Sequence, residues 1–520
     1  MVVRARFVLC LFALSLLFCL LMFAQTETND ALLRRGLRAL QAQDFAGADQ
    51  AFLQLVQRAP TADNYNNLAT AEAAAGQVGL AIGHLQKSIR LGNHTTSAHY
   101  NLGLLLMQAH RVDAATEEFR LAVALDPKYL PAYYGLGVAL MTSDHPREAA
   151  ALIEKTLELA PHDARLWALL VSAQFAARDL AKAVASTQNA VQSLPNDPRL
   201  DVTLATICLR FRVTQRAREL LEEAGELMPE DPEVALLLAK ASLMAGEPVE
   251  ALAVLQGMAP VDRKGTERLV LMGEARALLG DLDKAADDLR VALHDAPNDP
   301  QCLAAYAWLH NLAGHYNEAI TTLARARSIL PKAPWIPYGM AVSYYFLEQY
   351  ERAEKACEQV VQLDPRYAPA YLVRGITRLR EKRYEGARID FSKAVELAPD
   401  SSLFHRQLGI ALYDGGKAGP ANKQFDIALR LDPRDAEGYF WRAKSMETLG
   451  EKEKAISDLN TVVELQPGYS DAYTELARIY SETGRPAKAA DALAQQKQMG
   501  ASSQPSGDDT LLHTLPDATP

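Results

Sequence analysis

The chain has 520 residues, of which 49% are hydrophobic and 23% are charged, and these ordinary proportions exclude a wholly disordered protein. Its net charge of −10 argues against a general nucleic-acid binder, which usually carries a basic excess, and five cysteines exclude a scaffold built on disulfides. Length alone, at about 150 residues per domain, suggests three or four domains. Frequent alanine and few aromatic residues favour helices.

The first 24 residues have the pattern of an export segment. Arg4 and Arg6 precede an apolar run from Phe7 to Ala24 that only Ser15 interrupts. A basic start followed by an apolar stretch is typical of a signal peptide, and a run of 18 residues is also just long enough to span a bilayer. We therefore expect a cleaved signal peptide or an uncleaved membrane anchor over residues 1–24. Either one predicts an exported protein, whether periplasmic, secreted or otherwise extracytoplasmic.

The rest of the chain is periodic. Prolines recur every 34 residues at positions 127, 161, 195 and 229, and again at 297, 331, 365, 399, 433 and 467. An independent series of alanines runs in steps of 34 residues from Ala81 to Ala489. Chance does not sustain one residue type through such a series, so the chain consists of tandem repeats.

Each repeat is predicted to be a pair of helices. In residues 130–163, Tyr133, Leu136 and Leu140 lie on one face of a first helix. Pro146 fits the first turn of a second helix, and Pro161 ends it because the residue before a proline is pushed out of the helical region. The repeated alanines mark the places where two helix backbones approach closely. The sequence thus predicts an all-α protein built of antiparallel helix pairs.

These features resemble the tetratricopeptide repeat. The family pattern combines an aromatic residue, Leu-Gly, and alanines in the second helix that a proline closes. Here it is Tyr133, Leu136 and Gly137; Tyr371, Gly375, Ala387, Phe391, Ala394 and Pro399; and Tyr473, Leu476, Ala477, Tyr480 and Ala489. The resemblance covers about fourteen repeats in residues 25–500. It implies an α-solenoid in which helix pairs stack into a right-handed superhelix, with the first helix of each pair lining a concave groove.

Two segments depart from this regular pattern. Gly257, Pro260 and Gly265 predict an early end to a second helix and irregular stacking over residues 257–265. Residues 501–520 are rich in Ser, Pro and Asp, and we expect a disordered tail there.

The resemblance places partner-binding residues on the groove face of the first helices. Asn67 and Asn101 occupy equivalent positions, at which some tetratricopeptide domains hold the backbone of their target with an asparagine. Nearer the C-terminus, aromatic and basic residues gather, as is typical of binding hot spots. These candidates are Trp335, Tyr338, Tyr345, Phe346, Arg374, Arg378, Tyr413, Phe440 and Trp441. The aromatic residues could instead pack between adjacent repeats, and the asparagines could be ordinary solvated residues.

No set of residues in the sequence demands catalysis. The segment Gly415-Gly416-Lys417 lacks the other parts of a phosphate-binding loop, and the common hydrolase, metalloprotease and dithiol motifs are missing. We expect no cofactor, no metal, no small-molecule substrate and no nucleic acid. The leading interpretation is a non-enzymatic scaffold, exported or membrane-anchored, that binds a peptide or protein partner in its groove. The alternatives are an assembly factor of an envelope or secretion complex, and a regulatory or substrate-recruiting arm for a separate enzyme such as a glycosyltransferase.

Overall fold

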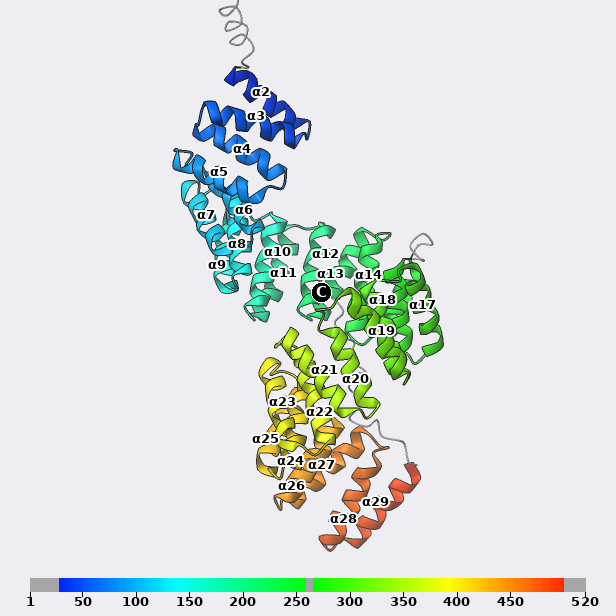
Figure 1. The fold of residues 1–520 in the computed structure, drawn as a ribbon. Coiled ribbons are helices and arrows are strands. Elements are labelled where there is room, and N and C mark those ends of the chain that lie inside the picture. The colour runs from blue at the N-terminus through cyan, green and yellow to red at the C-terminus, as the bar shows by residue number, and fades with distance from the viewer. Residues whose placement is uncertain (1–27, 259–264, 500–520) are drawn as a thin grey trace, which may run out of the picture. The chain divides into compact units, whose positions relative to one another are not determined.

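A computed structural model describes residues 28–258 and 265–499, which form 28 helices and no strand, in fourteen successive pairs along the chain (Figure 1). The predicted all-α solenoid of antiparallel helix pairs is therefore confirmed. The segments predicted to be a signal or anchor (residues 1–24) and a disordered tail (residues 501–520) lie outside the described residues. So does most of the irregular segment at 257–265.

The chain divides into two compact units, one ending at Leu237 and the other beginning at Leu238. The helix pairs of the first unit are α2 (Asn29–Gln41) with α3 (Phe45–Arg58), α4 (Ala62–Ala74) with α5 (Val78–Arg90), α6 (Thr96–Gln108) with α7 (Val112–Leu125), α8 (Leu130–Thr142) with α9 (Pro146–Leu159), α10 (Ala164–Ala176) with α11 (Leu180–Ser193), and α12 (Pro198–Arg210) with α13 (Thr214–Leu227). Helix α14 (Pro232–Met244) contains the boundary between the units.

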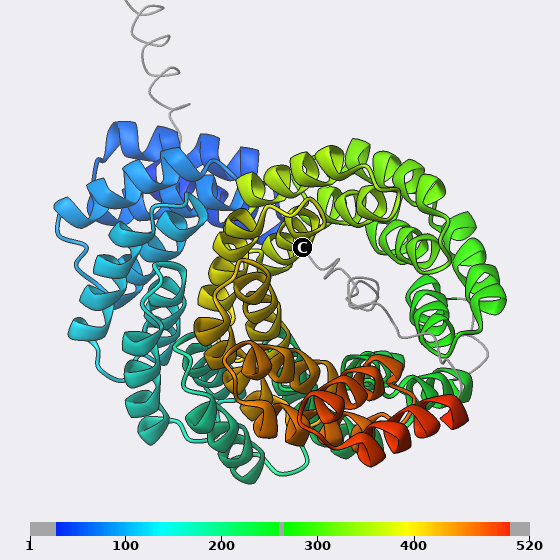
Figure 2. The same ribbon diagram turned by 90° about the horizontal axis from the view of Figure 1, so that it is seen from below.

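The second unit continues with α15 (Pro248–Gly257), which has 10 residues where α17 has 14. The following pairs are α16 (Thr266–Leu278) with α17 (Leu282–Asp295), α18 (Pro300–Leu312) with α19 (Tyr316–Ile329), α20 (Trp335–Phe346) with α21 (Tyr350–Leu363), α22 (Ala368–Arg380) with α23 (Tyr384–Leu397), α24 (Ser402–Asp414) with α25 (Ala418–Leu431), α26 (Ala436–Thr448) with α27 (Lys452–Leu465), and α28 (Ser470–Glu482) with α29 (Pro486–Met499). Within this unit the helices from α16 to α29 follow one another along a curve (Figure 2).

A residue with positive φ stands between the two helices of each pair. In the turn from α6 to α7 it is His110, with φ of 56°, and in the turn from α16 to α17 it is Gly280, with φ of 81°. The N–H of Arg111 then donates to the carbonyl of Leu106 at 2.8 Å, which satisfies a carbonyl group at the end of α6. This left-handed residue reverses the chain and fixes the antiparallel return of the second helix.

The alanine series marks the contacts between paired helices. Its members from Ala81 to Ala455 are fully buried. Glycine has a related role in several first helices, because a Cβ atom added at Gly375 would lie only 2.5 Å from the ring of Phe391 in the second helix. Gly409 and Phe425 repeat this arrangement one repeat later. The predicted close approach of the two backbones is confirmed, since no larger side chain fits these sites without displacing its neighbour.

Prolines of the series accept hydrogen bonds from an aromatic residue in the first turn of the next first helix. The hydroxyl of Tyr133 donates to the carbonyl of Pro127 at 3.2 Å, and the indole N–H of Trp167 donates to the carbonyl of Pro161 at 2.8 Å. The hydroxyl of Tyr371 donates to the carbonyl of Pro365 in the same way. These bonds satisfy a loop carbonyl and attach each connecting loop to the helix that follows it.

Asp201 breaks this pattern, since it stands on α12 at the position that Tyr133 and Trp167 occupy in earlier repeats. Its side chain is buried, and burial raises its pKa to about 6, with further contributions from Glu223 and Asp197. Because the folded-state pKa lies above the unfolded value, the group's stabilising contribution is present below about pH 4 and is lost as the pH rises through 6. At neutral pH, therefore, the ionised carboxylate destabilises the first unit.

We expect Asp201→Asn to stabilise the protein by about 1–2 kcal/mol at pH 7 and to have little effect at pH 4, since the amide is never charged. Thermal unfolding of the wild type and the variant at both pH values measures this. An equal change in melting temperature at the two pH values would contradict the assignment.

Candidate functional site

The aromatic candidates divide into buried and partly exposed residues. Trp335, Tyr338, Tyr345 and Phe440 are between 2% and 7% exposed, and so belong to the hydrophobic core of the second unit. Helix α20 is buried at almost every position, from Trp335 to Ser343 and again at Tyr345. These four side chains therefore expose almost no surface to a partner. Their burial agrees with the alternative interpretation, in which the aromatic residues pack between adjacent repeats.

Phe346, Tyr413 and Trp441 keep part of their surface exposed, but they contact neighbouring aromatic residues. Phe346 stacks on Tyr316, with ring centroids 5.2 Å apart. Tyr413 meets Trp441 edge to face at 5.9 Å, and the ammonium group of Lys444 lies 4.6 Å from the centroid of the Trp441 ring. A lysine over an aromatic ring is a cation–π contact, so this cluster already has an internal cationic partner.

Arg374 and Arg378 belong to an ion-pair network between helices α21, α22 and α23. Arg374 donates from Nη2 to Asp390 at 2.7 Å, and Arg378 donates from Nη1 to the other oxygen of Asp390 at 2.7 Å. Arg378 also donates to Glu354, which accepts a further bond from Arg383 at 2.7 Å. Burial opposes the charge on Glu354, but the bonds from Arg383 and Arg378 hold its pKa below the usual range. The structure thus gives both predicted binding arginines a structural role.

Asn67 and Asn101 lie on α4 and α6 of the first unit. Asn101 is exposed and Asn67 is half-buried. Within the described residues neither side-chain amide has a hydrogen-bond partner, so both can donate to and accept from a bound molecule. The same position holds Gly135 on α8 and Leu169 on α10, both buried, so the pair of amides does not extend further along the unit.

Two exposed apolar residues on α6 and on α8, which contacts α6, were not among the sequence-based candidates. Leu104 lies one helical turn after Asn101 and is 44% exposed, and Tyr134 on α8 is 37% exposed. The guanidinium of Arg165 lies 5.8 Å from the Tyr134 ring centroid. The sequence signal for Leu104 was its spacing of three from Asn101, which places both side chains on one helix face. We call Asn67, Asn101, Leu104 and Tyr134 the amide face.

The described residues contain no group of three or more His, Cys, Asp or Glu side chains arranged to hold a metal ion. The cysteines Cys208, Cys302 and Cys357 are free and buried. Burial raises the pKa of Cys208 to about 11 and that of Cys302 to about 12. A thiol with so high a pKa stays protonated at neutral pH and is a poor nucleophile, so these cysteines are core residues.

Several curated proteins are similar to parts of this chain. RNA polymerase II-associated protein 3 of Rattus norvegicus is 30% identical over 148 residues, which are 28% of this chain and 21% of that protein. Anaphase-promoting complex subunit 3 of Schizosaccharomyces pombe is 20% identical over 190 residues, 36% of this chain and 29% of that protein. Hsc70-interacting protein 1 of Drosophila melanogaster is 30% identical over 112 residues, 22% of this chain and 28% of that protein. The matched part of the chain thus spans between a fifth and a third of the length of these relatives.

The prediction of an exported location is wrong. The relatives are named as proteins associated with RNA polymerase II and with the anaphase-promoting complex, and neither name points to export. None of the helices in residues 28–258 and 265–499 is both long and apolar enough to cross a membrane. The prediction rested on the hydropathy of Phe7 to Ala24, and an apolar run by itself does not specify a destination.

The chain is also similar to solved structures and to family models. The crystal structure of the APC/C hetero-tetramer Cut9-Hcn1 aligns with 95% of this chain and 97% of that one, at 16% identity and a TM-score of 0.45. A crystal structure of MamA aligns with 30% of this chain and 91% of that one, at 21% identity and a TM-score of 0.29. Two models of the tetratricopeptide repeat match residues 66–129, 106–172, 214–274, 276–335, 338–402, 406–470 and 447–502. The family-model matches cover most of the sequence and span the observed helices, and the chain belongs to the tetratricopeptide repeat family.

Proposed function

We propose that this chain is a non-enzymatic scaffold that binds a protein partner on the amide face of its first unit. The observation that carries the proposal is the pair of equivalent amides at Asn67 and Asn101, which have no partner within the described residues. Leu104 on α6 and Tyr134 on α8, a helix that contacts α6, are exposed. In the second unit, by contrast, the first helix α20 has almost no exposed surface to offer.

The chemistry of the amide face suits an extended peptide. A side-chain amide can donate to a carbonyl and accept from an N–H, so two amides on adjacent repeats can hold a peptide backbone whatever its side chains are. Leu104 and Tyr134 supply apolar area, and burying such area is the main favourable term in association. Tyrosine is also enriched among binding hot spots.

The relatives support a protein as the partner rather than a small molecule. Hsc70-interacting protein 1 is named for a protein that it binds, and anaphase-promoting complex subunit 3 is named for the assembly that contains it. This chain shares their repeat family, although each match covers only part of the relative.

The test compares two pairs of substitutions in the full chain. Asn67→Ala with Asn101→Ala should weaken capture of specific partners from an extract of the native cells by about tenfold or more, since two hydrogen bonds to the partner are lost. The matched control is Gln57→Ala with Gln192→Ala, which removes two exposed amides from the second helices α3 and α11. Unchanged capture by the first variant, with both variants folded by circular dichroism, would reject the amide face as the binding site.

A further inference from the structure

A cavity lies at the turns between paired helices rather than on the first helices. The turn between α22 and α23 and the turn between α24 and α25, with the adjoining ends of α23 and α24, line an open cavity of about 460 Å³. Its charged lining residues are Lys382, Arg383, Glu385, Arg388 and Lys417. We call this cavity the turn pocket. The turn pocket lies in the second unit and shares no residue with the amide face.

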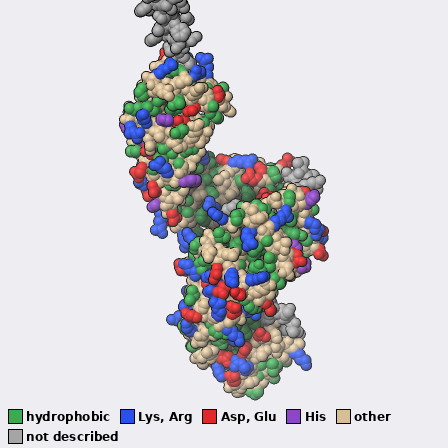
Figure 3. Space-filling view, in the orientation of Figure 1, with side chains coloured by type: hydrophobic (Ala, Val, Ile, Leu, Met, Phe, Trp, Pro, Cys, Tyr) green, Lys and Arg blue, Asp and Glu red, His purple; other side chains and the backbone are tan. Residues whose placement is uncertain are grey.

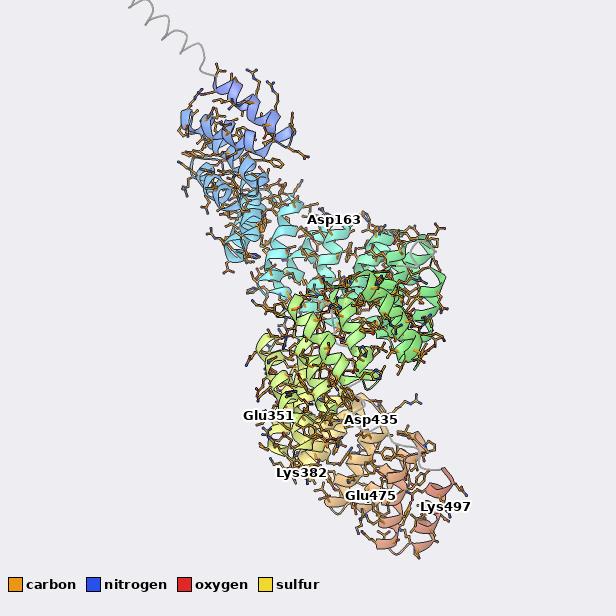
Figure 4. The ribbon with its side chains drawn as sticks, turned by 45° about the vertical axis from the view of Figure 1, so that its right-hand side comes forward. Asp163, Glu351, Lys382, Asp435, Glu475 and Lys497 are labelled. Carbon is orange, nitrogen blue, oxygen red and sulfur yellow. The ribbon has the colours of Figure 1, made fainter. Side chains whose placement is uncertain are left out.

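The turn pocket is strongly basic. Four of its lining residues are cations and one is an anion. The equivalent cavity one repeat earlier is lined by Glu348, Glu351, Glu381 and a single arginine, Arg352. Both cavities are formed by the same kind of turn, so the change from acidic to basic lies in the side chains and not in the repeat architecture. Figure 4 labels Glu351 and Lys382, one from each cavity, along the same edge of the second unit. Figure 3 shows acidic and basic side chains next to each other on this unit.

One carboxylate already occupies the turn pocket. Glu385 accepts from Arg388 at 2.6 Å, and the ammonium of Lys417, which belongs to the next repeat, lies 3.4 Å from its other oxygen. These bonds, first that from Arg388, lower the pKa of Glu385 to about 2. A carboxylate in this place is therefore held in its charged form by side chains from two successive repeats.

Lys382 is the cation of the turn pocket that remains available to a second anion. Lys382 is exposed, and no ion pair to it is formed by any residue that the structure describes. Arg383 is half-exposed and pairs with Glu354 and Glu381 outside the cavity. The lining thus carries more positive charge than Glu385 neutralises.

We propose that the turn pocket binds an acidic peptide segment of a partner protein, and that Glu385 is an internal competitor that occupies the place of the partner's carboxylate. A glutamate or aspartate of the partner displaces Glu385 from Arg388 and Lys417, and a second acidic residue contacts Lys382. A peptide is favoured over a compact ion because Arg388 and Lys417 already meet at one carboxylate, whereas Lys382 forms no ion pair with it.

Because Glu385 competes with the partner, removing its side chain should strengthen binding, whereas removing a side chain that contacts the partner weakens binding. The probe is a fluorescein-labelled peptide of alternating glutamate and glycine, whose binding to the full chain is measured by fluorescence anisotropy at low salt. Glu385→Ala should tighten binding about twofold to fivefold, because Arg388 and Lys417 are released. Lys382→Ala with Lys417→Ala should weaken it by a similar factor.

The matched control is Lys452→Ala with Lys454→Ala, which removes two lysines from the start of α27 in the next repeat. We expect it to change the affinity less than twofold. A loss as large as that of the Lys382 and Lys417 variant would mean general charge attraction and would overturn the proposal. So would unchanged or weaker binding after Glu385→Ala, or equal affinity of the wild type for a lysine–glycine peptide. All these side chains are on the surface, and unchanged melting temperatures confirm that the variants remain folded.

Discussion

Replacing Asp390 with asparagine is expected to destabilise the second unit by about 3–5 kcal/mol. The Asp390 side chain is 1% exposed, and it accepts hydrogen bonds from both Arg374 and Arg378. Asparagine keeps the shape but removes the charge and one acceptor, so the nearly buried Arg374 loses its ion-pair partner and Arg378 keeps only Glu354. Breaking a buried pair by changing one partner is costly because the other charge stays buried without compensation. Chemical and thermal unfolding measure the change.

Two further variants show whether this effect comes from the charge. Asp287→Asn removes an acid of the same type from an exposed pair with Arg290, and its effect should be about 1 kcal/mol or less. Combining Asp390→Leu with Arg374→Met and Arg378→Met should recover most of the lost stability, since no buried charge is then left unpaired. If Asp390→Asn costs less than the exposed control, the network does not stabilise the fold.

The second large effect is expected at Tyr338, which packs in the core with Val342 and Tyr371. Tyr338→Ala should destabilise the protein by about 3–5 kcal/mol, because it leaves a cavity among well-packed side chains. The control is Leu104→Ala on the amide face, whose side chain is half in solvent and whose loss should cost about 1 kcal/mol or less. Thermal unfolding compares the two.

The stability of each variant decides how a loss of partner binding is interpreted. A loss of partner binding after Tyr338→Ala would report unfolding, whereas a loss after Leu104→Ala in a protein with a normal melting temperature reports a lost contact. Equal stability of the two variants would contradict the assignment of Tyr338 to the core.

The repeat architecture was predictable from the sequence because it depends on contacts within each repeat. Ala149 and its equivalents lie where two helices meet, and Pro161 and its equivalents lie where a second helix ends, so both recur with the full period. The left-handed turn residue was harder to recognise, since His110 and Gly280 take the same conformation with different side chains.

The exposure of the aromatic residues was not predictable in the same way. The spacing of Trp335 or Tyr338 within α20 shows which face of its own helix it occupies, but burial also depends on the helices of both neighbouring repeats. Those neighbours cover α20 on nearly all sides and leave only a narrow strip of this helix in solvent. Residue type alone therefore placed core aromatics among the binding candidates.

The structural role of the arginines could have been predicted from their spacing to acidic residues, although residue type alone suggested binding. Asp390 follows Arg374 by sixteen residues, and Asp458 follows Arg442 by the same distance and forms the same pair at 2.7 Å. A first helix and the second helix of its repeat bring residues at this spacing together. An acid and a base that recur at this spacing predict an internal ion pair rather than a binding site.

The most direct test of the proposed scaffold function places a photo-crosslinking amino acid at one position of the full chain in its native cells. At Asn101 on the amide face, irradiation should join the chain to a specific protein partner. At Gln192, which is also exposed and lies on the second helix α11, irradiation should give no such product. The same partner crosslinked from both positions, or from Gln192 alone, would contradict binding on the amide face.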